Sequence, residues 1–106
     1  MKEEEWLESL KQGRILPESD LICLCERAKE IFIEENNVQN VQSPVVICED
    51  IRGQFFDLLS IFSIVGEIPY RKFIFMGNLI DYGYGSVEVV ELLLTLKVIY
   101  LSLIHI

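Results

Sequence analysis

Two short apolar runs, each followed by a polar turn, most constrain how this chain folds. Val45–Cys48 is wholly apolar and rich in β-branched residues, and Phe73–Met76 is apolar and partly aromatic. Runs of this length and composition are typical of buried strands. A helical pattern of apolar residues separates them, so both strands can lie parallel in one sheet, joined by a right-handed crossover. The sequence therefore predicts a strand-helix-strand unit.

Four segments carry apolar residues at the spacing of amphipathic helices and complete the expected order of elements. The first spans residues 2–12, and the second runs from about residue 17 to residue 37. The third begins at residue 55 and ends near residue 66, and the last begins at Ser86, which can cap it. We therefore expect an α/β fold in which two N-terminal helices precede a strand-helix-strand-helix unit.

The size and charge of the chain limit its fold and its partners. Its 106 residues are 51% hydrophobic, which suits one small domain with a packed core. The formal net charge of −8 argues against nucleic acid and acidic membrane surfaces as partners. Residues 89–106 are strongly apolar, but Glu91 and Lys97 interrupt them. We expect both side chains to be solvated, with a membrane span as the alternative.

Cysteine usage and the first residues indicate a reducing compartment. The three cysteines are an odd number, and Cys23 and Cys25 stand two residues apart in a helical pattern. We expect all three to be ordinary buried thiols rather than disulfides or metal ligands. The first residues are charged and amphipathic, unlike a secretory signal, so we expect a cytoplasmic protein, with the nucleus as the alternative.

The carboxyl ends of the two expected strands form the candidate site. Glu49 and Asp50 follow the first strand, and Asn78 follows the second. Ligands of open α/β sheets lie beyond such ends, and oxygen-bearing side chains there suit hard or borderline metal ions. Arg52, however, stands where a metal site needs a neutral ligand. Asp50 and Asp81 can also serve as turn-capping side chains, and Asn78 can simply serve a turn, so both interpretations stay open.

The sequence around both strands resembles a known enzyme family. Around the first strand it reads SPVVICEDIRGQFFDLL, which resembles G-D-x-H-G-Q, the first metal motif of serine/threonine protein phosphatases of the two-metal phosphoprotein phosphatase family. Around the second it reads FIFMGNLIDYGYGSVEVVELLLTLK, which resembles the second motif, G-D-x-V-D-R-G, and the helix that follows it. Upstream, LPESDLICLCERAKEIFIEENNVQNVQSP is similar to the type-2A group of that family.

The resemblance runs from about Trp6 to Tyr100, which implies that residues 1–100 are the N-terminal part of a phosphatase catalytic domain. The family's fold is a β-sandwich flanked by helices, and this chain would form a truncated portion of it. The family's reaction is the hydrolysis of phosphoserine and phosphothreonine in proteins, and it depends on two divalent metal ions of the manganese or iron/zinc type. Intact relatives act on phosphoprotein substrates and bind scaffold or regulatory subunits.

The same resemblance assigns family positions to five residues. Asp50 matches the aspartate of the first metal, and Arg52 stands at the position of the histidine ligand. Asn78 stands at the position of the metal-bridging aspartate. Asp81 matches the catalytic aspartate that orients the catalytic histidine, although that histidine is absent here. Tyr82 stands at the position of the phosphate-binding arginine.

These departures weigh against a working hydrolytic centre. Asn78 offers one neutral oxygen where two cations need an anionic bridge, and the guanidinium of Arg52 stays protonated. Tyr82 removes a bidentate phosphate clamp, and the third family motif, G-N-H-E, is not present. We expect a degenerate, inactive phosphatase chain that binds metal weakly or not at all. The alternative is a pseudophosphatase module that binds a phosphatase scaffold or regulatory subunit.

The last six residues, 101–106, depart from the family. They read LSLIHI, where relatives continue into a proline-containing turn. The six residues match one reading frame of a common sequencing-adaptor end, so we interpret them as a non-native tail. His105, the one histidine of the chain, then drops out as a metal ligand or general base.

Overall fold

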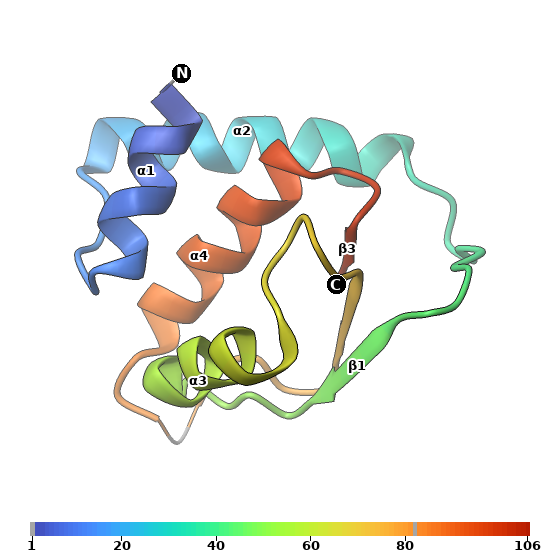
Figure 1. Cartoon of the computed structure of the whole chain (residues 1–106). Helices are drawn as coiled ribbons and strands as arrows, with labels where there is room; N and C mark the ends of the chain where they lie inside the picture. The colour runs from blue at the N-terminus through green and yellow to red at the C-terminus, as the bar shows by residue number, and fades with distance from the viewer. Residues whose placement is uncertain (1, 82) are drawn as a thin grey trace.

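Helices and a small parallel sheet follow one another in the order that the sequence predicts. The computed structural model describes residues 2–81 and 83–106. In these residues the elements are α1 (Lys2–Lys11), α2 (Glu18–Glu34), β1 (Val46–Glu49), α3 (Phe55–Val65), β2 (Phe73–Met76), α4 (Ser86–Ile99) and β3 (Ile104–His105) (Figure 1). The expected α/β class is confirmed, and each predicted helix and strand is present within a few residues of its expected bounds.

The sheet is parallel throughout the part of the chain that is described. Its order is β1-β2-β3, and Val46 pairs with Phe73 while Glu49 pairs with Met76. The predicted parallel pairing of the two main strands is therefore confirmed. The third strand was not predicted: Ile104 pairs with Phe73 and is fully buried. Two residues are too few to show a strand pattern in the sequence. The pairing of β3 with β2 does not test whether residues 101–106 are a non-native tail.

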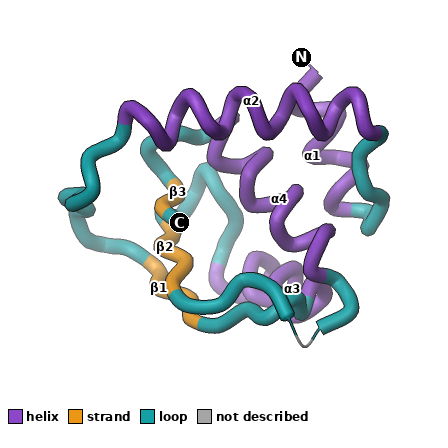
Figure 2. Tube along the Cα trace, turned by 180° about the vertical axis from the view of Figure 1, so that it is seen from behind, coloured by secondary structure: helices purple, strands orange, loops and turns teal. Residues whose placement is uncertain are grey.

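Helix α4 lies at the centre of the molecule. It contacts α1, α2, α3 and β3. In both views α1 and the sheet lie on opposite sides of α4, while α2 crosses one end of it and α3 the other (Figures 1 and 2). Apolar side chains around most of its circumference explain this position, because a helix that is apolar on all sides is stable only when it is surrounded.

The sheet buries one face only. That face packs against α3 and α4: the ring of Phe62 on α3 packs edge-on against Phe73 at a centroid distance of 5.1 Å, and α4 contacts β3. On the other face the side chains of Ile47 and Met76 are 57% and 50% exposed. The expectation of a fully buried first strand is therefore wrong for Ile47, because helices in the described residues cover a single side of the sheet.

Lys97, which we expected to be solvated, is fully buried. Its Nζ atom donates to Glu35 Oε2 at 2.6 Å and to the backbone oxygens of Leu101 at 3.0 Å and Ile104 at 2.8 Å. It also lies 5.9 Å from the centre of the Phe32 ring. These partners come from the end of α2 and from the segment after α4, so the charge is compensated inside the protein.

No helix in the described residues is long and apolar enough to cross a membrane.

Glu91, the second charged residue in the apolar stretch, is also buried rather than solvated, with 2% of its surface exposed. Its Oε1 atom accepts a hydrogen bond from the backbone N–H of Leu16 at 2.9 Å. Its Oε2 atom is buried without a hydrogen-bond partner among the described residues. Burial raises the pKa of Glu91; the bond from Leu16 lowers it, and the negative charge of Glu88 raises it further.

Glu91→Gln is expected to stabilise the protein at neutral pH and to have little effect in acid. Because the native pKa is raised, the folded state holds the proton more tightly, so the contribution of Glu91 to stability falls as pH rises from 4.5. Glutamine removes this loss and retains the acceptor for Leu16. The measurement is the urea midpoint against pH, with exposed Glu26→Gln as the control. Parallel curves for wild type and Glu91→Gln would contradict the expected pH dependence.

The three thiols differ in burial. Cys48 is buried in β1, and burial raises its pKa, which keeps it a neutral thiol. Cys23 is half-buried and Cys25 is exposed on α2. The prediction of three buried thiols is therefore wrong for Cys25, because the face of α2 that packs against the core is centred on Leu24 and Ala28.

Candidate functional site

The candidate site is built from the two loops that follow β1 and β2. In the first loop Asp50 and Arg52 have positive φ angles of 51° and 53°, and in the second Asp81 has a φ of 71°. Non-glycine residues adopt this left-handed conformation infrequently, and Asp is among those that tolerate it best. Such tight turns return the chain toward the helix that follows each loop.

Backbone hydrogen bonds join the two loops beyond the ends of the strands. The N–H of Arg52 donates to the oxygen of Asn78 at 2.9 Å, and the N–H of Gly83 donates to the oxygen of Arg52 at 2.8 Å. A Cβ atom at Gly83 would lie 2.4 Å from the carbonyl carbon and oxygen of Gly53. This close approach requires a glycine at residue 83. The two loops lie side by side, as the strand topology predicts.

The carboxylate of Asp50 is committed to its own turn. Its Oδ1 atom accepts a hydrogen bond from the backbone N–H of Asn78 at 3.0 Å. It fits there because residue 77 is a glycine, where a Cβ atom would lie 2.1 Å from Oδ1. Its Oδ2 atom lies 3.6 Å from Nη2 of Arg52, and both side chains are about half-exposed. The turn-capping interpretation of Asp50 therefore has direct geometric support.

Asp81 makes a contact of its own in the second loop. Asp81 lies in the exposed part of the second loop, and its backbone N–H donates to Oγ of Ser86 at 3.1 Å. The expectation that Ser86 caps α4 is wrong, because the N-cap is Gly85 and the Ser86 hydroxyl is used by Asp81. Sequence reasoning missed this contact, which joins residues five apart in a glycine-rich turn. Tyr82, the expected phosphate-binding position, lies outside the described residues.

His105 is placed away from the two loops. It lies in β3 beside Ile74 of β2, two residues before that strand ends, and its buried Nδ1 atom has no hydrogen-bond partner among the described residues. Burial lowers the pKa of His105, as does the charge of Lys97, while Glu35 opposes the change. His105 therefore lies within the electrostatic influence of Lys97 and Glu35 and not at the two loops.

The donor set does not fit two divalent metal ions. Within residues 2–81 and 83–106, no three Asp, Glu, His or Cys side chains are grouped so that they could hold a metal ion. Asp50 occupies the first expected ligand position, and the guanidinium of Arg52 lies beside its carboxylate. Two cations would have to displace a permanently protonated group and then share a neutral amide at Asn78.

The chain is similar in structure to a known enzyme. No family model matches the chain. Among solved structures, the chain is similar to a protein serine/threonine phosphatase from Saccharomyces cerevisiae, described as having similarity to human phosphatase PP5, with a TM-score of 0.77 and 29% sequence identity. The match covers 88% of this chain and 32% of the yeast chain, so this chain spans about a third of that phosphatase. In sequence and in fold, the chain is therefore similar to part of a serine/threonine protein phosphatase.

Proposed function

We propose that this chain is a degenerate relative of the type-2A-like serine/threonine phosphatases and that it does not hydrolyse phosphoserine or phosphothreonine. The observation that carries the proposal is the set of contacts that the Asp50 carboxylate makes. One of its oxygens accepts the N–H of Asn78, and the other faces the guanidinium of Arg52. The residue at the first ligand position is thus used to close a turn.

Charge explains why this arrangement disfavours catalysis. Two divalent cations close together repel each other and need anionic oxygens between them, which Asn78 does not supply. Arg52 adds a further positive charge at the first site, 3.6 Å from the carboxylate that would bind metal. Loss of a residue that only supports a metal ligand commonly costs ~10–100-fold in metal affinity. The loss of two ligand positions is expected to cost more, so we propose that manganese, iron or zinc binds weakly or not at all.

The proton-transfer and phosphate-binding parts of the site are also affected. Asp81 holds the orienting position, but the histidine it would orient is not present in the second loop or elsewhere in residues 1–100. Tyr82 replaces a cationic phosphate ligand with a phenol. Phosphoprotein substrates are accordingly proposed only for intact relatives. We keep the proposal that residues 1–100 correspond to the N-terminal part of the catalytic domain, that residues 101–106 are a non-native tail, and that the chain is cytoplasmic or nuclear.

A second candidate function is a non-catalytic module that binds a phosphatase scaffold or regulatory subunit. The observation that favours it is the open face of the sheet, where Ile47 is 57% exposed and Met76 is 50% exposed. Apolar surface of this kind is commonly covered by another layer of protein. A buried core that includes Leu58, Leu92 and Leu93 is compatible with a chain that folds and presents that face.

The direct test is the turnover of a phosphoserine peptide by the purified chain in the presence of manganese. We expect no hydrolysis above the rate of the peptide with manganese alone. A chelator-sensitive release of phosphate that scales with protein concentration would overturn the proposal of inactivity. The second candidate would instead be supported by soluble, cooperatively unfolding protein, whereas aggregation through the open sheet face and unpaired edges would count against it.

Arg52→His combined with Asn78→Asp is expected to create measurable manganese binding without creating turnover. The change removes a cation and adds an anionic oxygen beside Asp50, so calorimetry should show affinity at least about tenfold tighter than that of the wild type. Hydrolysis should remain absent because the G-N-H-E motif is not part of these 106 residues.

The control for this experiment is the same double variant with Asp50→Asn added. It should lose the manganese binding that the two substitutions create, because Asp50 is the anchoring carboxylate. Saturable binding of two manganese ions at micromolar concentration by the wild-type chain would contradict the proposed weak binding.

A further inference from the structure

A groove lies at the amino ends of the strands, across the sheet from the loops of Asp50 and Asn78. It has a volume of about 670 Å³ and is lined by Pro44, Val45, Val46, Pro69, Tyr70, Arg71, Lys72 and Leu103. A smaller hollow of about 330 Å³ shares Lys72 and Leu103 with it, so the two are neighbours. Together we call them the amino-edge groove.

The backbone fixes the walls of the amino-edge groove. The N–H of Val46 donates to the oxygen of Lys72 at 2.8 Å, and the N–H of Phe73 donates to the oxygen of Leu103 at 2.9 Å. These bonds hold together the segments that enter β1, β2 and β3. The groove therefore crosses the ends of all three strands.

The charge of the amino-edge groove differs from that of the chain as a whole. The chain has 17 Asp and Glu residues and a net charge of −8, yet none of the described residues that line the groove or its hollow is Asp or Glu. Among the described lining residues, the positive charge comes from Arg71 and Lys72.

The basic residues of the groove also lack carboxylate partners within the described chain. Ion pairs engage Lys2, Lys11, Arg27, Arg52 and Lys97. Arg71 instead donates to the backbone oxygen of Tyr70, and Glu67, four residues before Arg71, is paired with Lys11 at 3.4 Å. The positive charge of Arg71 and Lys72 is therefore available to a ligand.

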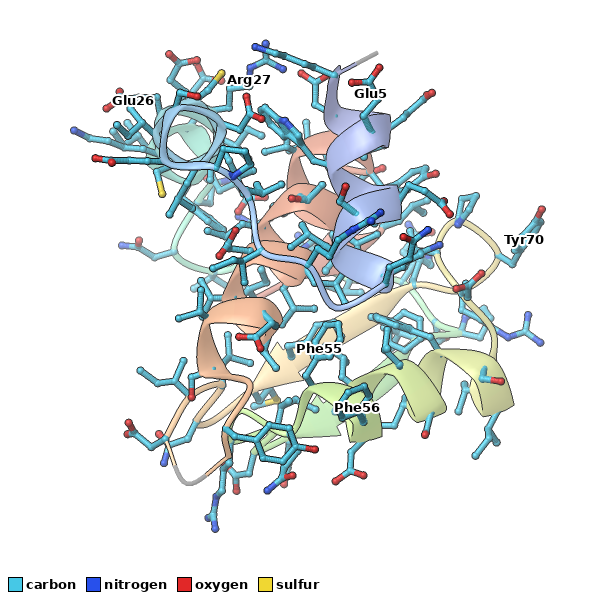
Figure 3. The ribbon with its side chains drawn as sticks, turned by 90° about the vertical axis from the view of Figure 1, so that its left-hand side faces the viewer. Glu5, Glu26, Arg27, Phe55, Phe56 and Tyr70 are labelled. Atoms are coloured by element: carbon cyan, nitrogen blue, oxygen red, sulfur yellow. The ribbon has the colours of Figure 1, made fainter. Side chains whose placement is uncertain are left out.

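The rest of the amino-edge groove is apolar or aromatic. Val46, Pro69 and Leu103 line it, and the side chain of Tyr70 is 80% exposed. Figure 3 shows Tyr70 projecting away from the body of the protein. Tyrosine and arginine are among the residue types that contribute most to protein interfaces. A ligand that fits this surface needs both carboxylate and apolar groups.

We propose that the amino-edge groove binds an extended peptide segment of a partner protein, in which acidic side chains alternate with apolar ones. The net charge of −8 repels polyanions such as nucleic acid at long range. A short acidic peptide has few charges, and Arg71 and Lys72 attract them within the Debye length of about 8 Å at physiological ionic strength. Because the groove lies across the sheet from Asp50, its occupation is independent of the proposed loss of hydrolysis.

The test uses the full chain and a blocked, fluorescent peptide of about ten residues that alternates Glu and Val, which spans at most ~35 Å when extended. Fluorescence anisotropy should show saturable binding that weakens with added salt. Lys72→Glu should weaken that binding at least about tenfold, and Tyr70→Ala should weaken it several-fold. Lys29→Glu, which makes the same charge change on the exposed side of α2, should leave it within about twofold.

Two further controls keep the test decisive. Lys72→Met removes the charge while keeping the stem of the side chain, so it should weaken binding even if Lys72→Glu fails to fold. The same peptide with Gln in place of Glu should not bind. Absence of saturable binding, equal binding of the Gln peptide, or equal effects of Lys29→Glu and Lys72→Glu would each overturn the proposal. So would concentration-dependent dimerisation abolished by Lys72→Met, because the occupant would then be a second copy of this chain.

Discussion

Phe55→Ala is expected to lower the free energy of unfolding by about 3–5 kcal/mol. The side chain of Phe55 is 2% exposed, and it points from α3 toward α4 in the interior (Figure 3). Removing the ring costs the transfer of its apolar surface and leaves a cavity that the surrounding helices fill only in part. Since a domain of this size is stable by about 5–15 kcal/mol, the loss is a large share of the total.

Phe56 provides a matched control for this prediction. It is the next residue on the same helix, and its side chain is 59% exposed, with its ring 6.1 Å from that of Tyr84. Phe56→Ala should change stability by no more than about 0.5 kcal/mol, as is usual for surface positions. Urea unfolding followed by circular dichroism measures both variants. Equal losses for the two substitutions would show that the packing of α3 against α4 is not as described.

Lys97→Met should lower the free energy of unfolding by about 3 kcal/mol. Methionine fills much of the same volume, so the loss comes from polar groups and not from a cavity. Without Nζ, the buried backbone oxygens of Leu101 and Ile104 lose a charged donor, and Glu35 loses its counter-charge. Breaking a buried ion pair on one side costs more than removing both partners, because the remaining charge is left uncompensated.

Glu35→Gln separates the ion pair from the other contacts of Lys97. Glu35 is partly exposed, and glutamine retains an oxygen acceptor for Nζ, so we expect a loss of about 1 kcal/mol. The double variant Lys97→Met and Glu35→Gln should lose less than the sum of the single losses, because the two residues are in contact. Additive losses, or a Lys97→Met protein as stable as the wild type, would contradict the described role of Lys97.

The elements of this fold follow from local patterns in the sequence. Periods of apolar residues predict α1–α4, and the β-branched and aromatic runs predict β1 and β2 with parallel pairing. The convergence of Asp50 and Asn78 follows from the same topology, because the carboxyl ends of neighbouring parallel strands meet. Local patterns did not predict β3. Its residues, Ile104–His105, form a strand because the free edge of β2 offers them hydrogen-bond partners.

The amino-acid sequence by itself determined the order of helices and strands, the pairing of β1 with β2 and the loops on which Asp50, Asn78 and Asp81 stand. Only the tertiary structure decided that Lys97 is buried, since Glu35, which compensates its charge, lies 62 residues away along the chain. It likewise decided the orientation of Asp50, whose carboxylate turns toward Asn78 across the space left by Gly77. Burial and side-chain direction depend on partners brought together by folding, and local periodicity contains no information about them.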